Sequence, residues 1–182
     1  MNQPPDPAFP GLRIRPMLAS DLPAVLEMDR TTPRAPHWGL LDYQNCLQAA
    51  EAPAEAVKGL LRRAWVAECG GDALGDELSG ILGFAVVRGV AVGAQFECEL
   101  ESLVVRPEAQ RRGVGSTLLA GAIHHLRAAG ASLFLLEVRP SNLPAIRLYE
   151  RFGFTLAGLR KGYYAGQNGM PSEDALLMQL SF

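Results

Sequence analysis

The sequence has little of what marks secreted, metal-binding or membrane-spanning chains. Its three cysteines, Cys46, Cys69 and Cys98, are an odd number without the spacing of a metal site, which indicates free buried thiols in a reducing compartment. No apolar run is long enough to cross a bilayer, and residues 1–10 lack the apolar centre of a signal peptide. We therefore expect a cytoplasmic protein that does not enter a membrane, with residues 1–10 as a disordered tail.

Charge of either sign is not in excess. With a formal net charge of −2, the chain is not expected to bind nucleic acid or an anionic membrane through a broad charged surface. Its 182 residues, of which 48% are hydrophobic, suffice for one sizeable core and are few for two. The sequence contains no internal repeat, and we expect residues 11–182 to form a single domain, as a monomer or a homodimer.

The spacing of apolar residues predicts the helices and strands. Alternation or short apolar runs predict strands, and spacings of three and four residues predict helices. The predicted strands are 12–17, 64–68, 82–87, 96–105, 133–138, 154–157 and 175–180. Four helices are predicted: one begins after an N-cap at Ser20, one begins after Gly113, and the other two cover 41–51 and 143–151. This order predicts an α+β fold, a mixed αβα sandwich with helices on both faces of the sheet.

One segment has the pattern of an anion-binding turn. The strand that ends at 103–105 leads into a turn with Arg111 and Arg112, and Gly113 and Gly115 stand where a helix begins. Free N–H groups and the helix dipole favour a phosphate there, and a residue without a side chain lets it approach the backbone. The residue pattern excludes a Walker loop and a dinucleotide-binding Rossmann loop. Tight helix packing is the alternative explanation of the two glycines.

A carboxylate stands inside the next apolar strand. Glu137 lies in the run 133–138, where an ionised side chain is costly unless it has a partner or a wet cavity beside it. An ion pair with Arg139 or a strand end that reaches solvent would explain it without a function. The short helix 143–151 follows and ends at Gly153, a residue suited to a left-handed cap.

These two segments resemble the GNAT superfamily of acetyl-CoA-dependent N-acetyltransferases. The run QRRGVG at 110–115 resembles the Q/R-x-x-G-x-G/A signature of that superfamily. The run LEVRPSNLPAIRLYERFGF at 136–154 is similar, more narrowly, to the bacterial ribosomal-protein alanine N-acetyltransferases, the RimI-like group. The similarity extends over 12–180, in its first half by pattern alone. It implies a GNAT-like fold, with a central mixed, mostly antiparallel sheet of about seven strands.

The resemblance also implies a cosubstrate, acetyl-CoA, and no metal. It assigns Glu137 as the general base and Tyr149 as the general acid that protonates the departing thiolate. Without the family, Tyr149 is equally well explained as a core tyrosine with a hydrogen-bonded tip. The residues implied to bind acetyl-CoA are Leu103, Val104, Val105, Arg111, Arg112, Gly113, Val114, Gly115, Ser116 and Asn142. For Asn142 the alternative is a simple turn residue or helix N-cap.

The acceptor is expected to be a primary amine. Trp38, Tyr163 and Tyr164 match aromatic positions beside the peptide channel of RimI-like proteins, although each could equally cover the edge of the core. The resemblance favours the N-terminal α-amine of an acceptor protein. An α-amino group with a pKa of ~8 is roughly one-tenth neutral at pH 7, so a base of modest strength suffices.

Two other functions remain open. A small-molecule amine, such as a polyamine, an amino acid or an aminoglycoside, would suit an acidic cleft. Glu97, Glu99 and Glu101 lie on one face of their strand and could supply it, although a solvated edge explains them as well. The third function is a non-catalytic acyl-CoA-binding module, and the presence of both Glu137 and Tyr149 argues against it.

Overall fold

The computed structural model describes residues 11–33, 35–50, 61–70, 80–92, 95–165 and 172–182. The predicted tail 1–10, most of the glycine-rich turn at 70–80 and the loop after Ala165 lie outside these residues. The described elements are β1 (Leu12–Pro16), a 3₁₀ turn (Ala19–Asp21), α1 (Leu22–Thr31), α2 (Leu40–Ala50), β2 (Leu61–Cys69), β3 (Gly80–Val92), β4 (Gln95–Val105), a second 3₁₀ turn (Pro107–Ala109), α3 (Val114–Ala128), β5 (Leu133–Val138), α4 (Leu143–Arg151), β6 (Thr155–Tyr164) and β7 (Glu173–Ser181).

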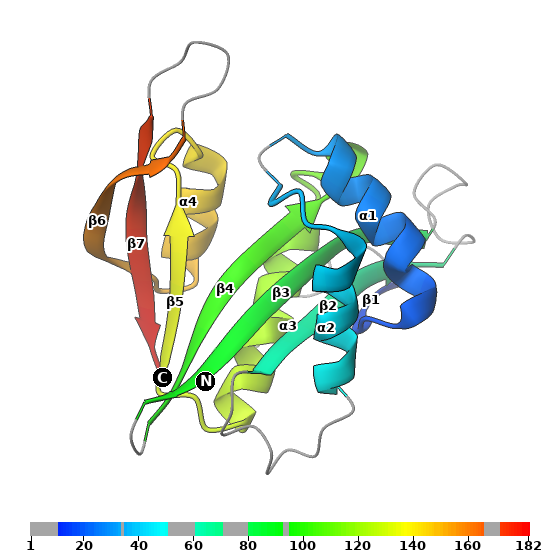
Figure 1. Cartoon of the computed structure of the whole chain (residues 1–182), viewed down its shortest axis with the longest axis horizontal. Helices are drawn as coiled ribbons and strands as arrows, with labels where there is room; N and C mark the ends of the chain where they lie inside the picture. Colours follow the sequence, from blue (N-terminus) through cyan, green and yellow to red (C-terminus); the bar gives the residue numbers. More distant parts are fainter. Residues whose placement is uncertain (1–10, 34, 51–60, 71–79, 93–94, 166–171) are drawn as a thin grey trace.

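The strands form one seven-stranded sheet in the order β1-β2-β3-β4-β5-β7-β6. Strands β4 and β5 are parallel, and the other neighbouring pairs are antiparallel. Helices α1 and α2 cover one face of the sheet, and α3 and α4 cover the other (Figure 1). The predicted α+β fold, with a mixed, mostly antiparallel sheet between helices, is confirmed.

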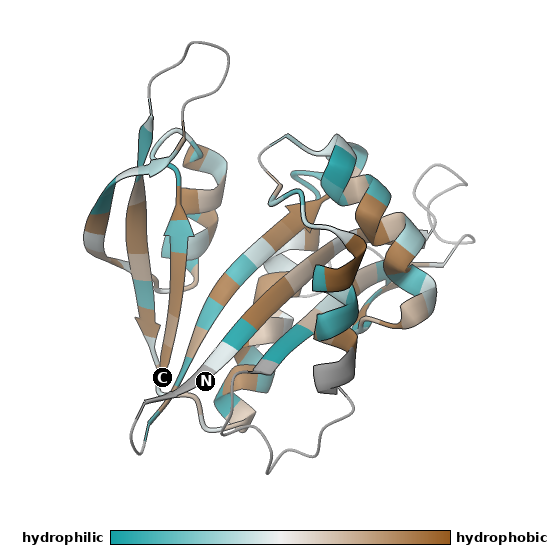
Figure 2. Ribbon diagram, viewed as in Figure 1, coloured by the Kyte–Doolittle hydropathy of each residue, from teal (hydrophilic) through white to brown (hydrophobic). Residues whose placement is uncertain are grey.

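Two apolar cores hold the layers together. The core under α3 and α4 includes Leu118 and Leu119 of α3 together with Phe134 and Leu136 of β5. The core under α1 and α2 joins α2 to the central strands, where Tyr43 meets Phe84 edge-on at 5.6 Å between ring centroids. Strand β3 serves both cores, so it is buried from residue 81 to residue 87 and reads as a continuous hydrophobic run (Figure 2).

The largest error in the predicted elements concerns β6. This strand was expected to end at residue 157, but it continues to Tyr164. Most of its residues are exposed because it is the edge strand of the sheet, so it lacks the apolar alternation that reveals a half-buried strand. The predicted cap at Ser20 is also wrong. Ser20 lies inside the 3₁₀ turn, and the carboxylate of Asp21 accepts the Leu18 N–H at 2.7 Å instead.

Strands β4 and β5 separate before they end. Their parallel pairing joins four pairs of residues, from Glu97 opposite Leu133 to Leu100 opposite Leu136. Directly after Leu100, the pairing of β4 with β3 shifts by one residue at Glu101, which marks a β-bulge. A bulge bends its strand and increases the local twist. The two strands diverge toward their carboxyl ends, leaving a gap in the sheet (Figure 1).

The three cysteines are free and buried, as predicted. Burial raises the pKa of the Cys46 thiol to about 11 and that of Cys98 to about 12, so both are neutral thiols at ordinary pH. Among the described residues, no helix combines the length and the apolar character that crossing a membrane requires.

We expect Gly83→Ala to destabilise the fold. A Cβ at Gly83 would lie 2.7 Å from the carbonyl oxygen of Val104 and 3.1 Å from Leu118 Cδ1, so β3, β4 and α3 would have to move apart. The expected loss in the free energy of unfolding is about 1–3 kcal/mol, measured by denaturant titration. Gly70→Ala is the control, because its Cβ would meet nothing within 4 Å. An unchanged midpoint for the Gly83 variant would show that the layers are less tightly packed than described.

Candidate active site

A cavity of about 1090 Å³ opens at the gap between β4 and β5. It brings together eight of the residues predicted to act in catalysis or binding: Trp38, Leu103, Val104, Glu137, Asn142, Tyr149, Tyr163 and Tyr164. Val105 and the turn 111–116 are not part of its lining. The turn lies beyond the end of β4, where α3 begins.

The cavity is bounded by different side chains on the two faces of the sheet. Glu137 alternates along β5 with Leu136 and Val138, both of which belong to the core under α3 and α4. Since successive side chains of a strand point to opposite faces, Glu137 lies on the face that α1 and α2 cover. Tyr149 belongs to the α3 and α4 core. The two predicted catalytic side chains therefore approach the gap from opposite faces.

Tyr149 is a buried phenol at the inner wall of the cavity. Its residue is 7% exposed and its ring packs 5.8 Å from that of Phe154. Burial, and to a lesser degree the neighbouring Tyr164, raise the pKa of Tyr149 above its ordinary value. The phenol is therefore protonated at neutral pH and can donate a proton.

Glu137 is ion-paired, but not with the partner that the sequence suggested. Its carboxylate pairs with Arg160 of β6, and Glu137 is 10% exposed whereas Arg160 is 57% exposed. Arg139, its neighbour in sequence, instead pairs with Glu173 at 3.2 Å. The guanidinium of Arg160 also lies 4.7 Å above the Tyr163 ring. The pKa of Tyr163 is raised mainly by the Glu137 carboxylate and, to a lesser degree, by burial.

Every carboxylate in the cavity lining has an arginine partner. The pairs are Glu99 with Arg88, Glu101 with Arg62, Glu137 with Arg160, and Glu173 with Arg139. Of the three carboxylates expected to form an acidic face, Glu99 and Glu101 are paired with arginines of β3 and β2, and Glu97 does not line the cavity. Arg88 and Arg139 line the cavity themselves, and Arg62 and Arg160 pair with its carboxylates from outside the lining, so each of the four negative charges is balanced by a neighbouring arginine.

The mouth of the cavity is aromatic. Trp38 lies 5.6 Å from the Tyr43 ring, and the Arg62 guanidinium lies 5.2 Å from the Trp38 ring. The loop that carries Trp38 is held by Asp29, a carboxylate only 1% exposed that accepts the His37 N–H at 3.2 Å. Trp38 packs against the core under α1 and α2 and also lines the cavity, so its position agrees with both explanations considered from the sequence.

Tyr163 and Tyr164 form the other side of this mouth. Their rings meet edge-on at 5.0 Å, and the guanidinium of Arg139 lies 3.9 Å above the ring of Tyr164. Burial raises the pKa of Tyr164 to about 12, so its phenol stays protonated at neutral pH.

The glycines of the predicted anion-binding turn have separate structural roles. Gly113 caps α3 with φ of 86°, and Arg111 before it has φ of 57°, so both lie in the left-handed region. Such turns, and the first N–H groups of a helix, form concavities that bind anions. A Cβ on Gly115 would lie 3.6 Å from Leu148 and from Val105, an ordinary van der Waals distance, so packing alone does not require a glycine at that position.

Asn142 occupies the N-cap position of α4 but makes no side-chain capping hydrogen bond. The side-chain capping role considered from the sequence is therefore not observed, although Asn142 closes a turn by donating its N–H to the carbonyl of Arg139 at 2.9 Å, and the residue also lines the cavity. Within the described ranges, no cluster of three or more His, Cys, Asp or Glu side chains could hold a metal ion.

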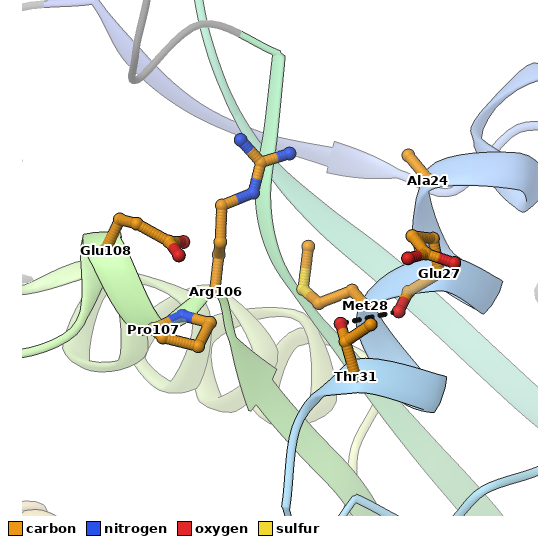
Figure 3. Close-up of a pocket in the computed structure, with 7 residues that line it drawn as sticks. All are labelled: Ala24, Glu27, Met28, Thr31, Arg106, Pro107 and Glu108. Atoms are coloured by element: carbon orange, nitrogen blue, oxygen red, sulfur yellow. Dashed lines mark hydrogen bonds between the residues drawn. The ribbon is translucent and has the colours of Figure 1, made fainter.

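A second hollow of about 530 Å³ lies between α1 and the connection from β4 to α3 (Figure 3). Arg106 projects between Glu108 and Met28 there, while the carboxylate of Glu27 is paired with Arg30 at 2.8 Å. No residue predicted to belong to the active site lines this hollow.

The polar residues of the site that the sequence did not reveal include Ser102, Arg88 and Glu173 in the lining, and Arg160, the partner of Glu137. Arg160 lies on the exposed strand that was predicted too short, so no pattern marked it. Ser102 is a small polar residue in the apolar end of β4, 6% exposed and in the cavity lining. Like Glu137, Ser102 is a polar residue inside an apolar strand, and this feature could have revealed it.

Comparison with known proteins places the chain in a family. Residues 29–154 match the model of the acetyltransferase (GNAT) family. This match spans well over half of the sequence, so the chain belongs to the GNAT family of acetyltransferases, as the two motifs indicated.

The similarity narrows further within that family. The [ribosomal protein bS18]-alanine N-acetyltransferase of Escherichia coli K12 is 43% identical over 84 residues, which are 46% of this chain and 55% of that protein. An N-alpha-acetyltransferase of Saccharolobus solfataricus is 41% identical over 78 residues, which are 42% of this chain and 44% of that protein. The chain thus spans about half the length of the curated relatives it matches.

Solved structures extend the likeness to the whole fold. The crystal structure of the ribosomal-protein-S18-alanine N-acetyltransferase from Escherichia coli matches with a TM-score of 0.70 and 28% identity, over 93% of each chain. Arabidopsis thaliana NAA60, crystallised with acetyl-CoA, matches with a TM-score of 0.75 over 94% of this chain and 98% of that one. At 20% identity, the match to NAA60 shows only that the two proteins share a fold.

Proposed function

We propose that this protein transfers the acetyl group of acetyl-CoA to the N-terminal α-amine of a protein, as the ribosomal-protein alanine acetyltransferases do. The observation that carries the proposal is the gap between β4 and β5, with Glu137 on one face and Tyr149 on the other. An acyl transfer to an amine needs a proton acceptor on the side of the amine and a proton donor on the side of the leaving sulfur.

The cofactor would occupy the gap as an added strand. Beyond Leu100, β4 no longer pairs with β5, so its edge at Leu103–Val105 can hydrogen-bond the pantetheine arm. The amides from Arg111 to Ser116 would hold the pyrophosphate, and the side chain of Asn142 would bond to the arm from α4. The left-handed conformation of Gly113 supports this arrangement.

In the proposed reaction, the Glu137 carboxylate takes a proton from the acceptor ammonium. The freed amine nitrogen bonds to the acetyl carbonyl carbon, and the carbon–sulfur bond breaks as the phenol of Tyr149 gives its proton to the sulfur. The nitrogen releases its second proton to water, which leaves a neutral amide, and protonated Glu137 and the Tyr149 phenolate return to their starting states by proton exchange with solvent. Glu137 is paired with Arg160 before the acceptor arrives. The acceptor ammonium, also a cation, can take the place of that guanidinium at the carboxylate.

The charges of the cavity favour a protein N-terminus over a polyamine. A polyamine carries several positive charges and would need unpaired carboxylates along its length. Each carboxylate in the lining already has an arginine partner. A single α-ammonium followed by uncharged backbone suits a cavity with balanced charge and an aromatic mouth at Trp38, Tyr163 and Tyr164.

Gly113→Val should abolish acetyl-CoA binding measured by calorimetry, because its side chain would keep the pyrophosphate from the amides of the turn. Valine at φ of 86° also strains the backbone, so the control is Gly130→Val, a glycine with φ of 78° just beyond the other end of α3. That variant should bear a comparable strain, on the order of 1–2 kcal/mol, and bind normally. Undiminished affinity in a folded Gly113 variant would contradict the phosphate site.

Glu137→Gln and Tyr149→Phe should each slow acetyl transfer by about 10²- to 10⁴-fold, the usual contribution of a positioned acid or base. Both changes keep the shape of the side chain and remove the group that moves a proton. Calorimetry should give near wild-type acetyl-CoA affinity for both, and Lys161→Gln on exposed β6 should leave turnover unchanged. Wild-type turnover of the Glu137 and Tyr149 variants would rule out these roles.

A short peptide with a free N-terminal alanine and an internal lysine should be acetylated on its α-amine. The lysine amine, with a pKa of ~10.4, is neutral on the order of a hundred times less often at pH 7. Tandem mass spectrometry of the product places the acetyl group, and the same peptide with a blocked N-terminus should remain unmodified. Acetylation confined to lysine, or transfer to polyamines alone, would replace this proposal with a different acceptor.

A further inference from the structure

Ser102 carries a polar atom without a partner inside the candidate active site. The residue is 6% exposed, and its Oγ is buried with no hydrogen-bond partner among the residues that the structure describes. It lines the cavity between β4 and β5. A buried hydroxyl without a partner is costly, and nearly all such groups in folded proteins find one. A ligand in the cavity would supply the missing partner.

The fold directs this hydroxyl toward the side from which the acceptor would come. Ser102 pairs with Val86, which belongs to the core under α1 and α2, and directly opposed residues of antiparallel strands share a face. Glu137 and the loop of Trp38 lie on that same face. Tyr149 lies on the opposite face.

The bulge at Glu101 is responsible for this orientation. Leu100 packs into the core under α3 and α4, so in a regular strand Ser102 would point there too. The extra residue in β4 shifts the alternation, and Ser102 turns to the other face at the point where β4 leaves β5. Leu103 and Val105 then pack against the α3 and α4 core, next to the proposed path of pantetheine.

We propose that the Ser102 hydroxyl binds the acceptor amine and orients it for attack, an inference that rests on the function proposed above. An α-ammonium has three N–H bonds, and one proton passes to Glu137. The neutral amine keeps two N–H donors and a lone pair. If Ser102 Oγ accepts one of these N–H groups, the nitrogen can no longer rotate freely, and its lone pair is held toward the acetyl carbonyl carbon.

The test compares Ser102→Ala with the wild type on the alanine peptide. The variant should lower kcat/KM for the peptide by about 3- to 10-fold, the usual effect of one hydrogen bond, and leave acetyl-CoA affinity unchanged. Its denaturation midpoint should stay the same or rise, because the variant removes a buried hydroxyl that has no partner in the free protein. Loss of activity without loss of stability distinguishes a bond to the acceptor from a structural role.

Two further variants serve as controls. Thr32→Val removes another buried hydroxyl without a partner, on a residue 8% exposed that lines neither cavity, and should leave the kinetics unchanged. Ser102→Cys keeps a side chain of similar size with a weak acceptor, so it should be as slow as the alanine variant. Recovery of activity in the cysteine variant would mean that the rate depends on the volume of the side chain and not on a hydrogen bond, which would overturn the role of Ser102.

The outcomes separate this inference from the proposed function. Wild-type kcat/KM in Ser102→Ala, or an equal loss of acetyl-CoA affinity, would overturn the role of Ser102 and leave the proposed function standing. Failure of the wild-type protein to acetylate the alanine peptide would overturn the proposed function, and the role of Ser102 with it.

Discussion

The candidate site depends on one constraint, the shortness of the parallel pairing between β4 and β5. A parallel pair needs a crossover connection, and α3 supplies it, so the amino end of α3 comes to lie just beyond the carboxyl end of β4. Because the pairing stops after four residue pairs, the strands part and leave a gap that side chains line from both faces. One feature of the sheet thus produces both the cavity and the turn beside it.

The gap also keeps the proposed acid and base apart. Glu137 reaches it from the face of α1 and α2, and Tyr149 from the face of α3 and α4. Two such groups in direct contact could exchange a proton with each other without any acetyl transfer. On opposite faces, each can meet a different reactant, provided that the reacting carbon lies in the plane of the sheet.

The sequence predicted the strands, the helices and the residues of the site to different degrees, for physical reasons. Strand β5 and helix α3 were correctly placed because buried elements carry a periodic apolar pattern. The edge strand β6 carries none, so its length and the position of Arg160 were missed. Glu137 stood out because a carboxylate is costly in an apolar strand, but its partner could not be predicted. The choice of Arg160 over Arg139 depends on how distant strands come together in the folded sheet.

The arginine partners of the cavity carboxylates affect how an acceptor approaches. Each carboxylate lies beside a guanidinium, so at a distance the cavity presents a set of dipoles, whose field falls off faster than that of a net charge. An incoming chain therefore gains little from long-range electrostatic steering, and its association rate should vary only weakly with ionic strength. Discrimination between acceptors then takes place at contact, through the shape and hydrogen bonding of the cavity, and not during diffusional encounter.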